Sequence, residues 1–100
     1  MIRGTTPTHT FALPISLSEF KNIRIVYAQD STVILKKELQ SCHIVDNTIT
    51  VTLTQEETLK FSHKKPVRIQ IKALTVNGEV VSTPIHVVSV EECLDDEVIV

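Results

Sequence analysis

Four histidines and two cysteines are the side chains of this 100-residue chain best suited to metal binding. The histidines are His9, His43, His63 and His86. None of them forms a His-x-His or His-x3-His pair, the spacings that place two imidazoles on one face of a strand or helix. A zinc ion held by histidines of different strands together with Cys42 or Cys93 is the alternative. We expect the histidines to be scattered, at the surface or half-buried, and the protein to hold no metal.

The adjacent Cys42 and His43 are the one pair with the residue types of a catalytic nucleophile and its base. Neighbouring residues of a strand point to opposite faces, so these two side chains do not meet. The N-terminal residues MIRG lack the basic-then-apolar order of a signal peptide, which indicates synthesis in the cytoplasm. Thiols in a reducing compartment rarely pair, so we expect Cys42 and Cys93 to remain free and to pack as small hydrophobic side chains.

Carboxylates gather at Glu56-Glu57 and in the segment EECLDDE, which covers residues 91–97. The first pair fits the start of a helical turn and the second a solvated tail, so neither predicts a catalytic carboxylate pair. With only two glycines, the chain lacks the glycine-rich loop that binds phosphate. One tyrosine and no tryptophan leave few aromatic platforms for sugars or single-stranded nucleic acid. We therefore expect no enzyme activity, no cofactor and no small-molecule substrate.

The composition is typical of one small β domain. The chain has 13 valines, 11 isoleucines and 12 threonines but three alanines, and β-branched side chains pack well on a pleated sheet. A net charge of −2 and a pI near 6.0 indicate no basic surface for nucleic acid, and no apolar run reaches the ~20 residues that span a membrane. We expect a single domain over residues 1–90 and an acidic tail over residues 91–100 that ends in an apolar segment.

Alternating apolar and polar residues predict about seven short strands. They cover residues 8–13, 21–29, 32–37, 39–45, 48–54, 67–73 and 79–90. Residues 15–20 fit either a strand or one helical turn. The pattern predicts an all-β fold, an antiparallel two-sheet β-sandwich that is Ig-like in the loose sense, with one short helical turn. An open partial barrel is the alternative.

Five residues are expected to shape the connections between these strands. Thr54 and Glu57 have the spacing of a capping box, in which each side chain binds a backbone N–H at the start of a helical turn. Asn77-Gly78 predicts a tight primed hairpin turn, because both residue types accept a positive φ. Pro84 lacks an N–H, so it marks a sheet edge or a β-bulge.

The order of these motifs resembles a known family. The opening RGTTPTHTFAL is similar to the start of small virion proteins encoded in prophages of Gram-positive bacteria. The run VTLTQEETLKF…VRIQIKALTVNGEVVSTPIHVVSV resembles the N-terminal module of phage baseplate upper proteins, in which a strand enters a T-x-E-E-T turn before an I-Q-I-K-x-L strand and an Asn-Gly or Asp-Gly hairpin. The resemblance implies a β-sandwich without enzymatic activity that packs into a phage particle, in the tail, the baseplate or the head–tail joint.

The resemblance also implies where the protein works and what it contacts. We expect it in the virion, in contact with other virion proteins and with further copies of itself, and not with nucleic acid or membrane. Val98-Ile99-Val100 is a candidate interface, because three β-branched residues in an extended segment can join a neighbouring sheet. A stand-alone binding module for a host protein or carbohydrate, and a small enzyme or metal protein, are the competing hypotheses.

Overall fold

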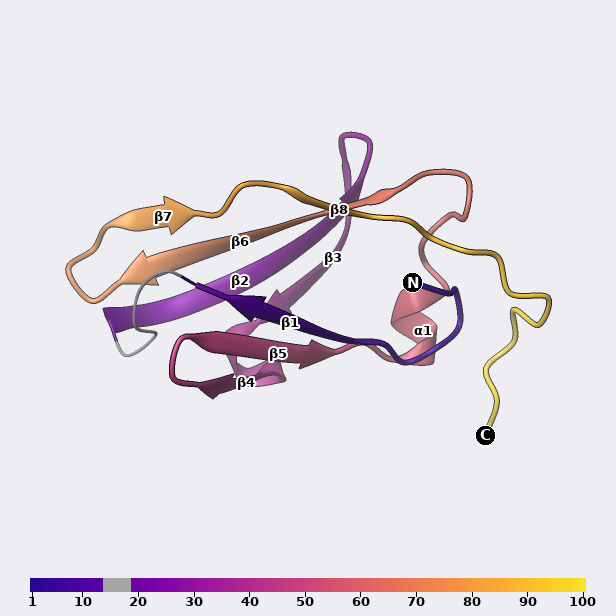
Figure 1. The fold of residues 1–100 in the computed structure, drawn as a ribbon, viewed down its shortest axis with the longest axis horizontal. Helices are drawn as coiled ribbons and strands as arrows, with labels where there is room; N and C mark the ends of the chain where they lie inside the picture. Colours follow the sequence, from indigo (N-terminus) through magenta and orange to yellow (C-terminus); the bar gives the residue numbers. More distant parts are fainter. Residues whose placement is uncertain (14–18) are drawn as a thin grey trace.

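The computed structural model describes residues 1–13 and 19–100, and these residues form a sandwich of two antiparallel sheets (Figure 1). Strands account for 51% of the described residues and helical turns for 8%. The predicted all-β sandwich is therefore confirmed. Of the ambiguous stretch 15–20, residues 15–18 lie outside the described part, while Phe20 is the first residue of a strand.

The smaller sheet has three strands in the order β1-β5-β4. Its members are β1 (Thr8–Ala12), β4 (Cys42–Val45) and β5 (Thr48–Thr52). Both β1 and β4 pair with β5 in antiparallel register, and a two-residue turn at Asp46-Asn47 joins β4 to β5. Strand β1 is thus an edge of this sheet.

The larger sheet has five strands, in the order β3-β2-β6-β7 with β8 also paired to β6. Its members are β2 (Phe20–Gln29), β3 (Thr32–Glu38), β6 (Val67–Thr75), β7 (Val80–Ser82) and β8 (His86–Val88). The short strands β7 and β8 lie one after the other along the same side of β6. They form one edge of the larger sheet and β3 forms the other.

The core lies between the two sheets and follows the alternation in the sequence. Ile49 and Val51 of β5 are buried, and so are every second residue of the central strands β2 and β6. These inward residues of β2 and β6 are Ile23, Ile25, Tyr27, Val67, Ile69, Ile71 and Ala73. Burial on these strands therefore follows the alternation of apolar and polar residues from which the strands were predicted.

The strand β5 ends in the short helix α1 (Gln55–Thr58), and the predicted capping box is present. The Thr54 hydroxyl accepts a hydrogen bond from the Glu57 N–H, and the Glu57 carboxylate accepts one from the Thr54 N–H. Glu57 also binds the Lys37 ammonium at 2.9 Å. The turn is thereby attached to β3 as well as capped, which the sequence pattern did not indicate.

The hairpin between β6 and β7 forms as predicted, but its turn is not the predicted primed turn. Gly78 has a φ of +87°, whereas Asn77 is not among the residues with positive φ. The Gly78 N–H donates to the Thr75 carbonyl, and the Thr75 N–H donates to the Glu79 carbonyl. These bonds define a three-residue loop with a glycine bulge, which needs a left-handed residue only at Gly78.

Pro84 lies in the break between β7 and β8, in agreement with the prediction of an edge or a bulge. Ile71 and Thr83 are joined by hydrogen bonds, and Ile69 pairs with His86. Two residues, Pro84 and Ile85, therefore stand opposite the single residue Gln70. An extra residue on an edge strand is the definition of a β-bulge.

The segments at the two ends of the chain lie beside α1, at the far end of the molecule from the β6–β7 hairpin (Figure 1). Ile2 forms a parallel bridge with Glu91, and the Arg3 guanidinium donates to the Leu59 carbonyl. The Gln55 side chain makes two hydrogen bonds of 2.9 Å with the backbone of Ile99. No helix of the described residues is long and apolar enough to cross a membrane.

Candidate functional site

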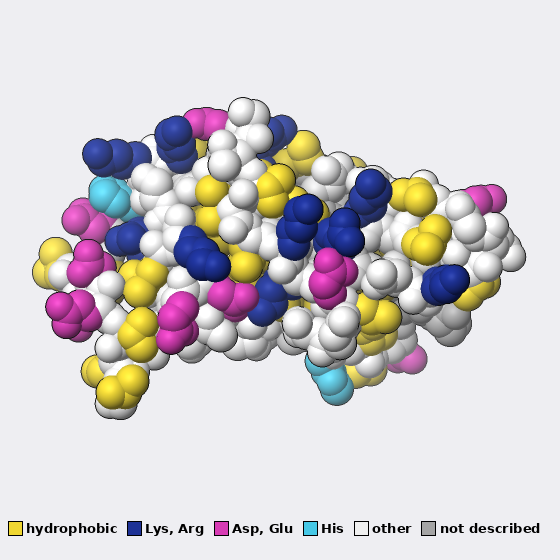
Figure 2. All heavy atoms as spheres, turned by 180° about the vertical axis from the view of Figure 1, so that it is seen from behind, with side chains coloured by type: hydrophobic (Ala, Val, Ile, Leu, Met, Phe, Trp, Pro, Cys, Tyr) yellow, Lys and Arg dark blue, Asp and Glu magenta, His cyan; other side chains and the backbone are white. Residues whose placement is uncertain are grey.

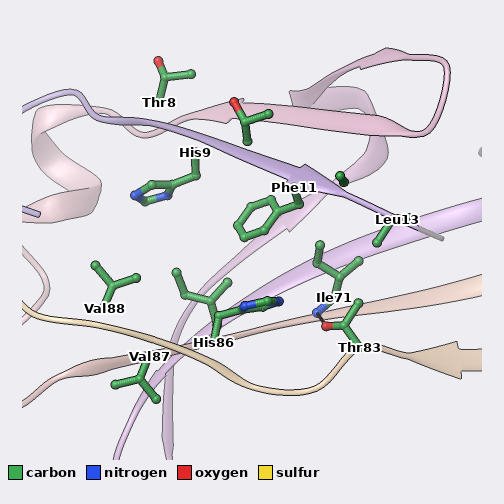
Figure 3. Close-up of a pocket in the computed structure, with 12 residues that line it drawn as sticks. Thr8, His9, Phe11, Leu13, Ile71, Thr83, His86, Val87 and Val88 are labelled. Atoms are coloured by element: carbon green, nitrogen blue, oxygen red, sulfur yellow. Dashed lines mark hydrogen bonds between the residues drawn. The ribbon is translucent and has the colours of Figure 1, made fainter.

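The open side of the sandwich holds a cleft of about 500 Å³ (Figure 3). One wall is the whole of β1, and the other is β8 with Thr83 before it. Ile69 and Ile71 of β6 form the floor. The cleft therefore lies where the edge of the smaller sheet faces the edge of the larger one.

Aromatic side chains cross this cleft in a row. His9 and Phe11 point from β1 into the cleft, whereas Thr8 points away from it (Figure 3). The ring centroid of Phe11 lies 6.1 Å from that of His86 on β8, and the centroid of His9 lies 5.7 Å from that of Tyr27 on β2. The two histidines, 77 residues apart in the sequence, thus line one cleft because the fold brings β1 and β8 together.

His9 and Tyr27 join the two sheets through a hydrogen bond of 2.9 Å between Nδ1 and the phenol oxygen. Burial lowers the pKa of His9 and raises the pKa of Tyr27, so near neutral pH both groups are uncharged. A neutral imidazole carries its proton on one nitrogen, so the tautomer decides whether the phenol O–H donates to Nδ1 or the Nδ1–H donates to the phenol oxygen. A neutral histidine held in this way is a positioned hydrogen-bonding group.

The backbone of β1 offers hydrogen-bonding groups at the cleft that have no partner among residues 1–13 and 19–100. In an antiparallel pair, alternate residues direct their N–H and C=O toward the partner strand. The Leu53 N–H donates to the Pro7 carbonyl and the Leu13 N–H to the Asn47 carbonyl, so odd-numbered residues of β1 face β5. The backbone groups of Thr8, Thr10 and Ala12 therefore face the open edge.

The other candidate groups for catalysis or metal binding lie apart. His43 is exposed on β4, and His63 lies 4.0 Å from Glu92 near the surface. Cys42 donates to the Glu38 carbonyl, and burial raises the pKa of its thiol, which disfavours the reactive thiolate. Within residues 1–13 and 19–100, no three His, Cys, Asp or Glu side chains gather in a group that could hold a metal ion.

The outer face of the larger sheet carries a second notable surface, on the side seen in Figure 2, where lysines and arginines gather among apolar side chains. The exposed cations of this face are Arg24, Lys36, Arg68 and Lys72. Arg24 and Lys72 are direct neighbours across β2 and β6, and Glu38 forms a 2.9 Å ion pair with Arg24. The side chains of Arg24 and Glu38 are 45% and 38% exposed, so this pair adds little to stability.

The residues singled out in the sequence do not form one site. Thr54 and Glu57 cap α1, Asn77 and Gly78 form the hairpin loop, and Pro84 lies at the bulge. Val98, Ile99 and Val100 are exposed beside α1, with Val100 fully so. Of these residues, only Pro84 at the bulge lies near the cleft. The sequence did not predict the cleft, because its two walls come from β1 and β8, which do not pair with each other.

Comparison with known proteins identifies no relative: no protein-family model, no curated protein and no solved structure matches this chain.

Proposed function

We propose that this protein is a non-enzymatic structural component of a phage or prophage particle, part of the tail, the baseplate or the head–tail joint, which acts through protein–protein contacts. The observation that supports the proposal most is the edge of β1, where Thr8, Thr10 and Ala12 offer backbone groups beside an apolar cleft. Such an edge binds an extended segment of another protein by adding a strand to the sheet.

The resemblance to baseplate upper proteins agrees with this chemistry. Its most specific motif, the T-x-E-E-T turn, corresponds to the capped helix α1, whose Glu57 connects the turn to β3. The hydrogen bonds of this motif stay within the chain: Thr54 and Glu57 form the cap, Gln55 binds the backbone of Ile99, and Thr58 binds the Thr5 carbonyl. The motif thus serves the sandwich architecture, while the exposed edges and faces supply the contacts.

The cleft favours one alternative, a stand-alone binding module for a host protein. Its lining contains no lysine, arginine, aspartate or glutamate, and a single phenylalanine with two imidazoles is a small platform for a sugar. A protein segment is therefore the better ligand for the cleft than a carbohydrate. The two functions differ in where the protein is found after phage production.

Mass spectrometry of purified particles tests the proposal. A strain carrying the gene is induced, and particles are purified by density gradient and washed in high salt to remove adsorbed protein. We expect peptides of this protein at a fixed ratio to a major tail protein across fractions. Its presence only in the soluble lysate, with none in particles, would contradict the proposal and favour the binding module.

A further inference from the structure

We propose that the open edge of β1 pairs with β1 of a second copy of this chain, antiparallel and about a two-fold axis. The two small sheets would then form one six-stranded sheet, in the order β4-β5-β1-β1-β5-β4. This inference deepens the proposed function and rests on its protein–protein contacts. The purified chain is sufficient for its test, so the two proposals fail independently.

The first argument is that the other edges of the two sheets are protected against pairing. Strand β3 carries Lys36 and Glu38 and has a bulge opposite Tyr27-Ala28. The β7–β8 edge consists of two strands of three residues each, separated by the bulge at Pro84. Charges, prolines, bulges and short strands are the usual means of preventing edge-to-edge association.

Strand β4 is protected by its length and surroundings. It has four residues, begins directly after the 3-10 turn Leu39–Ser41, and ends at Asp46, whose φ is +53°. In contrast, β1 has five residues in unbroken register with β5 and contains no charged residue at neutral pH, no proline and no bulge. It is the one edge of the described sheets without such protection.

The second argument is that β1 is complementary to itself. The backbone groups of β1 that have no partner in the described part of the chain belong to Thr8, Thr10 and Ala12, which are spaced evenly about Thr10. A register that places Thr10 opposite its own copy uses all five residues and lets every one of these groups form a hydrogen bond. Registers centred on His9 or Phe11 would pair fewer residues.

The same register also matches the side chains. On the cleft face, His9 would lie opposite Phe11 of the second copy, and Phe11 opposite its His9, so two aromatic cross-strand pairs form. On the outer face, threonine would lie opposite threonine at the axis, with Thr8 opposite Ala12 on either side. Two copies of β1 bring no like charges together, because the strand contains no lysine, arginine, aspartate or glutamate. A second copy therefore fits this edge better than a charged partner would.

Charge substitution at the axis tests the proposal, because Thr10 is exposed and its backbone is not needed for the contact with β5. We expect the wild type to be a dimer at tens of micromolar by sedimentation equilibrium. Thr10→Lys and Thr10→Glu should each weaken the dimer about tenfold, since like charges would lie directly opposite. An equimolar mixture of the two variants should restore dimers. Thr10→Val, which keeps the shape and the N–H, is the matched control and should remain dimeric.

Two further measurements make the outcome decisive. Amide exchange at Thr8, Thr10 and Ala12 should slow as the protein concentration rises, which a change of fold in a variant cannot imitate. A wild type that stays monomeric at 100 μM (about the upper range of such an experiment) would overturn the proposal. A dimer that survives Thr10→Lys but is lost when the chain ends at Asp96 would also overturn it and would place the contact at Val98-Ile99-Val100 instead.

Discussion

Glu57 combines two roles in one carboxylate. It caps α1 through Thr54 and binds Lys37 of β3, whose side chain is only 12% exposed. Burial alone would raise the pKa of Glu57, but the hydrogen bonds from Thr54 and Lys37 outweigh burial and lower it. The charged form is therefore the one that the fold stabilises, and this turn depends on pH.

Replacing Glu57 should show how much the ion pair with Lys37 contributes to the free energy of unfolding. Glu57→Gln retains an oxygen for the cap but leaves the Lys37 ammonium without its partner, so we expect a loss of about 1–2 kcal/mol in the free energy of unfolding at pH 7. Urea unfolding measures this loss. Glu56→Gln is the matched control, because Glu56 lies exposed in the same turn, and it should change stability by less than about 0.5 kcal/mol.

The pH dependence of the same variant follows from the sign of the shift. Since the folded pKa of Glu57 lies below its usual 4.5, the ion pair stabilises the fold above pH 4.5, and this stability is lost as the pH falls through the folded pKa. The difference between wild type and Glu57→Gln should therefore shrink in acid. An equal difference at pH 7 and pH 3 would contradict this account.

His9 provides a second test, at higher pH. Its folded pKa is lowered by burial below the usual 6.5, so the unfolded chain takes up a proton first as the pH falls, and the free energy of unfolding decreases below about pH 6.5. In His9→Gln this contribution disappears, and unfolding curves at pH 7.5 and 5.0 should lie closer together than in the wild type. An unchanged pH dependence in His9→Gln would show that this imidazole is not the titrating group.

Tyr27→Phe, which removes only the hydroxyl, should lower the free energy of unfolding by roughly 1 kcal/mol at pH 7.5.

At the scale of elements, variants of the β6–β7 hairpin can distinguish its three-residue loop with a glycine bulge from a two-residue primed turn. Only Gly78 needs a positive φ, and no atom lies within 4 Å of where its Cβ would be, so Gly78→Ala should cost about 1 kcal/mol from backbone strain alone. Asn77→Ala should be nearly neutral. Thermal unfolding of both variants measures the difference. Equal losses would instead favour the primed turn, in which both residues have positive φ.

The strands could be predicted from the sequence because each reads as a local pattern. Ile49 and Val51 alternate with threonines, and burial follows that alternation. The cap at Thr54 could be predicted for the same reason, since both of its partners lie within four residues. Asn77 shows the limit: its type accepts a primed turn, but the hairpin adopts a loop with a bulge, which the dipeptide alone does not specify.

The contacts that define the site depend on distant pairs, and no local pattern contains them. His9 meets Tyr27 from the other sheet, and Phe11 meets His86, across separations that only the order of strands determines. Gln29 is another example: this buried amide binds the backbone of Ser62 and Lys65 and holds the loop before β6. From the sequence, Gln29 could be predicted only as the last residue of a strand, and its contacts with the loop could not.

The whole molecule is a thin two-layer sandwich, with principal extents of 46 × 29 × 17 Å. A sandwich this thin has long edges relative to its core, and the cleft lies along one of them (Figure 3). Four exposed cations lie on the outer face of the larger sheet, while five carboxylates lie in residues 91–97. Edges and faces of this kind agree with a role in assembly.

The most direct test of that role is the titre of infectious phage after induction of a prophage from which the gene has been deleted. We predict that deletion lowers the titre strongly, that wild type and Thr10→Val supplied in trans restore it, and that Thr10→Lys does not. A deletion strain that yields infectious particles at the parental titre would contradict the central claim that this protein is a structural part of the particle.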